Sequence, residues 1–442
     1  MTDPYRSPAE LADLVTARLS AGSEMVIPIG NGEPPLLMDA LEASAEILPG
    51  VKIHQMHALR DRPYLHGAFA GRLEHVSWFL SPAARSAYEA SGCDLIPANF
   101  SEIPQRLIER QPAFVIAAAS LPDEHGWFSL GVSADYVAPL IGRVPFVLEA
   151  NAQMPYTAGM NAIHMNDVAG WAQVDEPLIE VSFKPLSARD QQIGQLVAER
   201  IPDAATLQIG TGTTPRGVVY ALGDHRNLGI HTELFSDDLM WLVESGVANG
   251  ALKRTHRHRA VTTFAFGSAK LHEWLDHNRS VYFLGVDEVN DPRQVAREDA
   301  FVAINGAIQV DLFGQCASET IGTKYYTGSG GQADFARGAM FAAEGRGFTV
   351  LHSTTSDGRI SRITPTLDTG AVVTTSKNTV DMVVTEYGVA ELRGRSFTER
   401  ARALIAIAAP EHREWLEREA MDMGLVKSGI GRTAAESQSL SA

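Results

Sequence analysis

Two short stretches with one pattern indicate the fold: IGNGEPP (29–35) and IGTGTTP (209–215). Each follows a short apolar run and precedes a segment with the spacing of an amphipathic helix. Strand, glycine turn and helix in this order form the repeating unit of an open α/β sheet. Coincidence in a chain with 38 glycines is the alternative interpretation. We favour two related α/β halves that open with the same unit.

Short apolar runs alternate with helical patterns along the rest of the chain, which favours parallel sheets covered by helices. In the stretch 174–190, Pro177 and Pro185 interrupt regular structure before a helix expected to start near Ser187. The sequence therefore predicts an α/β protein with domains at 1–186 and 187–430, followed by a small, polar and flexible tail at 431–442. Strands are expected within 24–32, 114–120, 144–150, 206–212, 280–285 and 381–386.

Length, charge and composition limit the class of protein. A chain of 442 residues is too long for one ordinary core. A net charge of −16 argues against a nucleic-acid partner. No apolar run approaches the ~18 residues that span a bilayer, and the N-terminus, where Ser7 and Glu10 predict a capped helix, has no signal-peptide core. Two cysteines make neither a disulfide framework nor a zinc set. We expect a cytoplasmic protein with no membrane partner.

Two glycine-rich turns are candidate ligand sites. The turn IGTGTTP (209–215) matches neither the dinucleotide fingerprint nor a P-loop, but it offers backbone N–H groups at a helix N-terminus, which suit a developing oxyanion. A tight turn with no ligand is the alternative. The loop TGSGGQADFARGA (327–339) also precedes a helix and could cradle a phosphate, a pantetheine amide or a thioester oxygen. A plain loop is the alternative there.

The histidines and cysteines give weaker signals. Neither the pair His54 and His57 nor the pair His256 and His258 has a carboxylate at a recognised metal spacing, so we interpret both as solvated surface and predict no metal site. We interpret Cys316, near the second glycine loop, as a small buried residue.

The stretch HTELFSDDLM (231–240) contains the most informative carboxylate. Ser236 fits a helix N-cap, Asp237 and Asp238 fit the first turn, and Gly246 fits the residue after the helix, so both aspartates have a structural interpretation. Glu233 precedes the cap at the expected carboxyl end of a strand. Ligands of open α/β sheets sit at that edge, which also carries the IGTG turn. From spacing alone, a functional group and ordinary surface charge both remain open for Glu233.

Several longer segments together resemble the class I CoA-transferase family, in its acetyl-CoA hydrolase/transferase and 4-hydroxybutyrate CoA-transferase branch. The resemblance implies two related α/β domains of the CoA-transferase/NagB-RpiA-like type, an active site at the domain interface, and a homodimer or higher homo-oligomer. The matching segments are ANFSEIP (98–104), HGWFSLGVSAD (125–135), NAQMPYT (151–157), VDEPL (174–178), HTELFSDDLM (231–240), VDLFGQ (310–315), IGTKYYTGSGGQADFARGA (321–339) and VVTEYGVAELRGRSFTERARALI (383–405).

The resemblance also implies a mechanism. CoA moves between an acyl-CoA and a small carboxylic acid by a ping-pong route, with Glu233 as the nucleophile. CoA is then a substrate, with no metal and no tightly bound cofactor. A backbone N–H of Thr211 or Gly212 would stabilise the oxyanion, and Glu386 would organise the site. The residues expected to bind CoA are Gly328, Gly330, Gly331, Gln332 and Lys324.

The chain departs from the family pattern at three places. Some relatives complete the oxyanion hole with an asparagine near GQxxSE, where this chain has Cys316 and Ala317. Thr211 stands where relatives often have an apolar residue, and Arg216 follows it.

Two other functions remain as alternatives to CoA transfer: acyl-CoA hydrolysis by the same glutamate, and a non-catalytic acyl-CoA-binding protein. A sugar-phosphate isomerase is disfavoured, because such enzymes lack the glutamyl relay and the TEYG segment.

Overall fold

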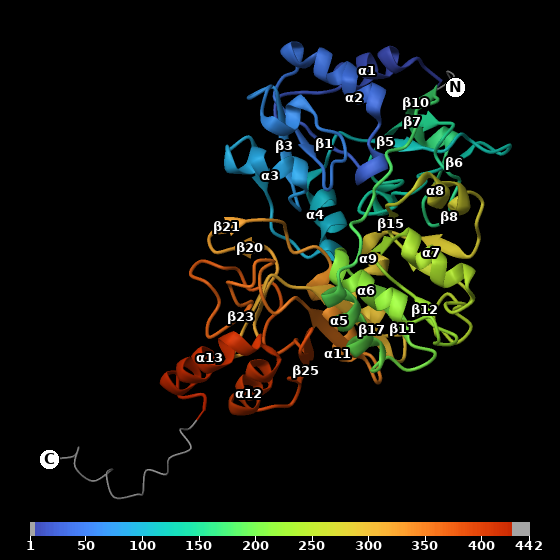
Figure 1. Ribbon diagram of the computed structural model, residues 1–442. Coiled ribbons are helices and arrows are strands. Elements are labelled where there is room, and N and C mark those ends of the chain that lie inside the picture. The colour runs from blue at the N-terminus through green and yellow to red at the C-terminus, as the bar shows by residue number, and fades with distance from the viewer. Residues whose placement is uncertain (1–4, 427–442) are drawn as a thin grey trace, which may run out of the picture.

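The computed structural model describes residues 5–426 and contains two large sheets, one in each half of the chain (Figure 1). The first sheet has the order β10-β7-β5-β1-β2-β3-β4, and every pair in it is parallel. Its inner strand FVIAAA, which is β5, is buried at every position, as expected for a parallel strand covered on both faces. The strands are β1 (Glu24–Val26), β2 (Val51–His54), β3 (Leu73–Ser77), β4 (Cys93–Leu95), β5 (Phe114–Ala119), β7 (Phe146–Asn151) and β10 (Val168–Val174).

Helices and short turns accompany this sheet. The first helix begins after Ser7, and Ser7 and Glu10 form the capping box that the sequence predicted. The helices are α1 (Pro8–Thr16), α2 (Pro35–Ala43), α3 (Pro82–Glu89) and α4 (Ile103–Arg110). The short 3-10 turns are η1 (Gly30–Gly32), η2 (Ala45–Ile47), η3 (Pro63–His66), η4 (Phe100–Glu102), η5 (Ala138–Leu140) and η6 (Met165–Asp167).

The second sheet has the order β12-β11-β17-β22-β24-β25 and is parallel except at β25. Its strands are β11 (Thr206–Ile209), β12 (Gly229–Ile230), β17 (Phe301–Gly306), β22 (Arg346–Val350), β24 (Met382–Thr385) and β25 (Gly388–Glu391). The helices of this half are α5 (Ala188–Ala198), α6 (Thr213–Ala221), α7 (Asp237–Glu244), α8 (Ala269–Leu275), α9 (Val286–Val289), α10 (Pro292–Val295), α11 (Gln332–Phe341), α12 (Phe397–Ile407) and α13 (Pro410–Asp422).

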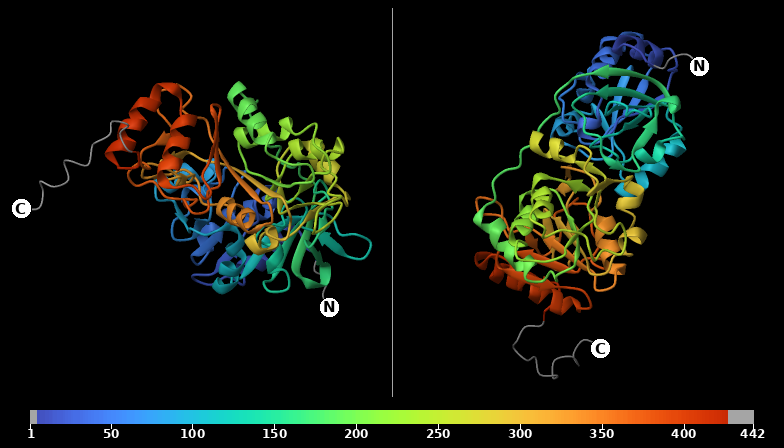
Figure 2. Two further views of the ribbon diagram at one scale, coloured as in Figure 1. Left: turned by 90° about the horizontal axis from the view of Figure 1, so that it is seen from below. Right: turned by 90° about the vertical axis from the view of Figure 1, so that its right-hand side faces the viewer.

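Small sheets join the two halves, which lie one above the other in the right-hand view of Figure 2. β8 from the first half pairs with β16 from the second, and Ser133 bridges to Phe264. One hydrophobic cluster includes residues of both halves, so the core is continuous across the junction. The remaining strands are β6 (Trp127–Ser129), β8 (Ala158–Gly159), β9 (Ala162–His164), β13 (Leu234–Phe235), β14 (Ala260–Thr262), β15 (Phe264–Ala265), β16 (Val281–Phe283), β18 (Gln309–Asp311), β19 (Cys316–Ala317), β20 (Thr320–Ile321), β21 (Lys324–Tyr325) and β23 (Ile363–Thr364).

The predicted α/β class is confirmed, and each predicted strand region contains a strand. Helix α5 begins after Ser187, its N-cap, as predicted. We propose residue 187 as the domain boundary, because the strands of the first large sheet precede it and those of the second follow it. Among residues 5–426, no helix has the length and apolarity needed to cross a membrane. The tail expected at 431–442 lies outside the described residues.

Candidate active site

Glu233 lies between β12 and β13, just beyond the carboxyl end of β12. β12 pairs with β11, which leads into the IGTG turn, so Glu233 and the turn share one sheet edge, as the sequence predicted. The Glu233 carbonyl oxygen accepts hydrogen bonds from Thr262 Oγ1 (2.9 Å), Thr263 N–H (3.1 Å) and Phe264 N–H (3.2 Å). These three donors fix the backbone from which the carboxylate projects.

The Glu233 carboxylate is surrounded by few donors. Asn290 Nδ2 donates to Oε2 at 2.8 Å, and the backbone N–H of Gly331 also donates to the carboxylate. Burial raises the pKa of Glu233 to about 7, although these two hydrogen bonds act to lower it. A Cβ atom on Gly331 would lie 2.1 Å from Glu233 Oε2 and 2.2 Å from Asn290 Nδ2. The glycine is therefore required for this approach.

The IGTG turn presents backbone donors beside Glu233. Gly212 has φ 108° and is the N-cap of α6, so the amides of the first turn have no acceptor within the helix. Helices α5 and α6 pack so closely that a Cβ on Gly194 would lie 2.2 Å from the Gly217 carbonyl oxygen. The Asp190 carboxylate, in the first turn of α5, accepts a hydrogen bond from Thr214 Oγ1 at 2.9 Å. This contact holds the start of α6 in place.

A cavity of about 560 Å³ brings these groups together. Its wall combines the IGTG turn, Glu233, the glycine loop 327–332 and, from the first half of the chain, His57 and Phe79. Further lining residues are Gln208, Asn305, Gly306, Ala307, Ile308, Ser318, Tyr326, Val350, Leu351 and Arg362. A carboxylate, helix N-terminal amides and a glycine loop thus face one space at the carboxyl edge of the second sheet.

One sequence interpretation is wrong. His54 is not solvated surface: it is fully buried, and its Nε2 lies 3.0 Å from Glu24 Oε2. His57 is half-buried, lines the cavity and has its ring centroid 4.3 Å from that of Phe79. Burial, with Arg85 nearby, lowers the pKa of His57 to about 4, so the ring is neutral at neutral pH. The local spacing gave no signal of these burials, because they arise from contacts with distant segments.

The other histidines and the cysteine match their interpretations. His256 and His258 are exposed, as interpreted. Cys316 is fully buried in β19 beside Ala317, and burial raises the pKa of its thiol to about 12.

The carboxylates that follow Glu233 have structural partners. Asp237 accepts a hydrogen bond from Ser268 N–H at 3.1 Å at the start of α8. Asp238 accepts one from Arg216 Nη2 at 3.1 Å, which directs Arg216 to α7. The predicted helix is present as α7, and Gly246 follows it with φ 76°, although Ser236 makes no side-chain capping bond.

Known proteins of similar sequence identify the family of the chain. Residues 267–420 match the family model for the acetyl-CoA hydrolase/transferase C-terminal domain. The chain is 40% identical to a succinyl-CoA:cyclohexane-1-carboxylate CoA transferase of Geobacter metallireducens, over 95% of each chain. It is 39% identical to the 4-hydroxybutyrate coenzyme A transferase of Clostridium kluyveri, over 94% of this chain and 97% of the relative. The chain belongs to the acetyl-CoA hydrolase/transferase family. It is therefore an enzyme of the CoA-transferase type.

The fold of a solved structure matches nearly the whole of this CoA-transferase chain. The crystal structure of RipA from Yersinia pestis superposes with a TM-score of 0.90 at 32% identity, over 96% of this chain and 98% of that one. The α/β architecture with parallel sheets is thus shared along the chain and is not limited to the segment that matches the family model.

The residues that the family resemblance implied lie at different distances from the cavity. Thr211, Gly212 and the segment Gly328–Gln332 line it, and Gln332 Nε2 is buried with no hydrogen-bond partner among the described residues. Glu386, which follows β24, does not line it. Its oxygens accept from Ser353 N–H and Ser353 Oγ, both at 2.9 Å. Lys324 is exposed on β21, with its Nζ 3.8 Å from Glu89 Oε1, and does not line the cavity either.

Sequence reasoning missed Asn290, which donates to Glu233, and two polar residues that line the cavity, Asn305 and Arg362. Asn305 is the last but one residue of β17, so its position at the carboxyl edge was a usable signal. Asn290 is the C-cap of the short helix α9, and no strand pattern marks it. Asn290 supplies a side-chain amide to Glu233. The sequence had drawn attention to a different position, near Cys316, where the asparagine of some relatives is absent. No local pattern marks Arg362.

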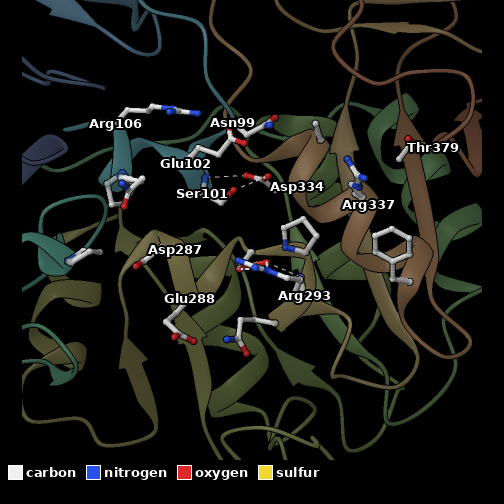
Figure 3. A pocket seen from close by; sticks show the side chains of 18 of the residues that line it. Asn99, Ser101, Glu102, Arg106, Asp287, Glu288, Arg293, Asp334, Arg337 and Thr379 are labelled. Carbon is white, nitrogen blue, oxygen red and sulfur yellow. Dashed lines mark hydrogen bonds and ion pairs between the residues drawn. The ribbon is translucent and has the colours of Figure 1, made fainter. Parts of the chain in front are cut away.

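A larger cavity, of about 990 Å³, lies on the other side of the first turn of α11 and does not include Glu233 (Figure 3). There the Asp334 carboxylate accepts hydrogen bonds from Ser101 N–H (3.0 Å) and Ser101 Oγ (2.9 Å). Phe100 N–H donates to the Gly330 carbonyl oxygen at 3.1 Å. Segment η4 of the first half therefore holds the loop that presents Gly331 to Glu233.

Proposed function

We propose that this CoA-transferase moves CoA between an acyl-CoA and a small carboxylic acid through covalent intermediates on Glu233. The observation that carries the proposal is a carboxylate with a raised pKa, held by Asn290 and Gly331, opposite the unpaired amides of a helix N-terminus in one cavity. Burial makes the carboxylate a stronger nucleophile once it is ionised, because it is poorly solvated.

The proposed steps exchange bonds of similar energy. A Glu233 oxygen attacks the thioester carbonyl, the C–S bond breaks, and CoA thiolate leaves an acyl–glutamyl anhydride. The thiolate then attacks the glutamyl carbonyl carbon, which releases the first acid as a carboxylate and forms a glutamyl-CoA thioester. A second carboxylate repeats the sequence in reverse and regenerates Glu233. No water, metal or nucleotide is consumed.

Two sets of donors serve these steps in the proposal. Each attack creates a tetrahedral oxyanion, and the backbone N–H of Thr211 or Gly212 stabilises it. The segment Gly328–Gln332 contacts the CoA portion, and the free Gln332 Nε2 suits an amide oxygen of the pantetheine arm. In the proposal Glu386 organises the site although it does not line the cavity, and Lys324, which also lies outside the lining, contributes to CoA binding. We also propose a homodimer or higher homo-oligomer, which light scattering will test.

The acids exchanged are proposed to be small carboxylic acids. Relatives are named for succinyl-CoA with cyclohexane-1-carboxylate and for 4-hydroxybutyrate. Hydrolysis is the second candidate, because the matching family model is named for both hydrolase and transferase. Thioester loss measured with and without added acetate, succinate or 4-hydroxybutyrate separates the two. Equal release of free CoA without an acid would contradict transfer.

The covalent step has a direct test. Incubation with acetyl-CoA, followed by borohydride reduction and peptide mass analysis, is expected to modify Glu233. Glu233→Ala should abolish the adduct and turnover. Glu74→Ala, at an exposed position on β3, is the matched control and should keep both. Binding without any adduct would support a non-catalytic acyl-CoA-binding protein instead.

A further inference from the structure

Arg362 is the permanent cation of the Glu233 cavity. It is half-buried and lines the same space as Glu233. Its guanidinium makes no hydrogen bond or ion pair with any residue between 5 and 426. Among the described lining residues, Glu233 is the one acid and Arg362 the one group that is always charged. A guanidinium with five unused donors therefore faces the candidate active site.

The backbone around Arg362 is fixed on both sides. Arg362 N–H donates to the Ser353 carbonyl oxygen at 2.8 Å, and the Arg362 carbonyl oxygen accepts from Val310 N–H at 2.9 Å. Strand β23 begins at the next residue. The side chain thus projects from an anchored position, which lowers the entropy lost when it binds a ligand.

Glu386, the acid whose charge acts on Arg362, is already bound by other groups. Glu386 is already held by Ser353 and lies 3.6 Å from Arg189 Nη1. Burial first, and then the charge of Arg189, lower the pKa of Arg362, while Glu386 acts in the opposite direction. Two arginines and one carboxylate leave a positive surplus, and a partly desolvated charge without a partner is unfavourable. An anion from outside the protein would relieve it.

The larger cavity provides a contrast. Its lining has four arginines and five acids. Two of the arginines are already paired, Arg106 with Glu109 at 3.0 Å and Arg293 with Asp291 at 2.6 Å. It therefore has no positive surplus. The unpaired charge lies in the cavity that contains the nucleophile.

We propose that Arg362 binds an anionic oxygen group of the substrate that is remote from the reacting carbonyl. Two parts of an acyl-CoA have this chemistry: the second carboxylate of a dicarboxylic acyl group, and a phosphate of CoA. The planar guanidinium pairs with either through two parallel hydrogen bonds. The inference rests on the proposed function, since it takes the Glu233 cavity as the acyl-CoA site.

The test uses thioesters that differ in the remote anion. Acetyl-CoA, succinyl-CoA, acetyl-pantetheine and succinyl-pantetheine are compared by the second-order rate constant for modification of Glu233. Arg362→Gln should lower this rate constant about 10- to 100-fold for the thioesters that carry the recognised anion. It should leave acetyl-pantetheine, which has none, unchanged. Arg359→Gln, three residues away and paired with Asp357 at the surface, is the control and should change none of them.

Each outcome has a defined meaning. A loss for both succinyl thioesters supports the carboxylate, and a loss for both CoA thioesters supports the phosphate. A loss of equal size for all four thioesters, or for none, overturns the proposal. The melting temperature of Arg362→Gln should stay unchanged or rise, because an unpaired charge is removed; a fall would indicate a structural arginine. If the wild-type protein is not modified at Glu233 by any thioester, the proposed function itself fails.

Discussion

The two IGxGxxP turns differ in what lies against their backbone. In the first, Ile29 N–H donates to an Asp135 carboxylate oxygen at 2.8 Å, and Ser133 Oγ donates to the Ile29 carbonyl oxygen at 2.8 Å. Gly30 is buried, and a Cβ there would lie 2.3 Å from the Phe266 ring. In the second turn, Thr211 and Gly212 are exposed and line the cavity. One turn is filled by the protein, and the other is open.

This difference shows that the repeated pattern specifies a backbone geometry and not a ligand site. Both turns join a parallel strand to a helix, yet a protein carboxylate already occupies a donor of the first. In our proposal, a substrate oxygen takes the corresponding place at the second. Each turn also has a buried acid with a pKa raised by burial to about 7, Asp135 at the first and Glu233 nearby at the second. Asp135 accepts several backbone N–H groups, whereas Glu233 faces a cavity.

The largest expected effect is on the stability of the closed turn. Gly30→Ala places a methyl group against Phe266 and strains a backbone with φ 57°. The free energy of unfolding should fall by about 2–4 kcal/mol, because overpacking and a left-handed alanine both cost energy. Chemical denaturation measures the loss. The rate of thioester exchange per folded molecule should stay within about threefold of wild type. Unchanged stability would mean that the first turn is not packed as described.

Replacing the glycine of the second turn should instead lower activity and change stability little. A Cβ at Gly212 meets nothing closer than 3.9 Å, so Gly212→Ala costs little packing, but φ 108° disfavours alanine and shifts the amide. We expect kcat/KM for CoA transfer to fall about 10- to 100-fold, in the range of a misplaced oxyanion donor. Steady-state kinetics together with denaturation separates the two effects. A variant with normal kinetics would remove the turn from the proposed oxyanion site.

The two buried acids should give pH dependences of the same sign when they are replaced, because burial raises both pKa values to about 7, but their replacements should differ in how much stability is lost. The pKa of Glu233 in the folded protein, about 7, is above its ordinary value of 4.5. Protonation therefore stabilises the native state, and this contribution is complete below pH 4.5 and lost as the pH rises through 7. Glu233→Gln removes that dependence, so its stability relative to wild type should increase between pH 5 and pH 8.

Asp135→Asn is the matched comparison, and thermal unfolding across the same pH range is the measurement. Asp135 is the acceptor of backbone N–H groups in the closed turn, so its replacement should lower stability at every pH. A stability difference for Glu233→Gln that does not change with pH would contradict its raised pKa.

The same ionisation should control the rate. Glu233 attacks as a carboxylate, so kcat/KM should rise with pH up to about 7 and then level off. The hydrogen bond from Asn290 Nδ2 acts to lower this pKa, so Asn290→Ala should move the limb to higher pH. Asn249→Ala, at an exposed site, is the control. A profile that is flat between pH 5.5 and 8.5 would show that Glu233 does not determine the rate.

The sequence predicted what depends on local spacing. Apolar periodicity placed the strands, and the order strand, turn, helix placed Glu233 and Gly212 on one edge. The serines at 7 and 187 marked helix starts because a cap requires only residues within one turn.

What the sequence did not predict depends on contacts between distant segments. Asp135, far from the first turn in sequence, accepts a hydrogen bond from Ile29 N–H in that turn. His57, in the first half of the chain, lines the cavity of the second half. Asn290, at the end of helix α9, donates to Glu233, which lies in a different segment of the chain. That the Arg362 guanidinium has no partner is visible only when its neighbours are in place. Such contacts have no period, so no pattern of one segment reveals them.

The smallest expected effect concerns the contact between Ser101 and Asp334, which supports the glycine loop 327–332 on the cavity wall. Ser101 donates twice to Asp334, in the first turn of the helix that follows Gly331, and this bond joins the two halves. Ser101→Ala removes the hydroxyl donor and leaves the backbone donor, so the loop should be held less firmly. We expect kcat to fall only severalfold, as for the loss of one hydrogen bond worth about 1 kcal/mol. Ser101→Thr keeps the hydroxyl and should restore the rate, and Ser86→Ala, exposed on α3, should have none of these effects. A different result would contradict this role: Ser101→Ala could lower the melting temperature and leave kcat and the pH profile unchanged. The contact would then stabilise the junction of the two halves without positioning the loop, and the geometry of the second turn would depend only on contacts within the second half of the chain.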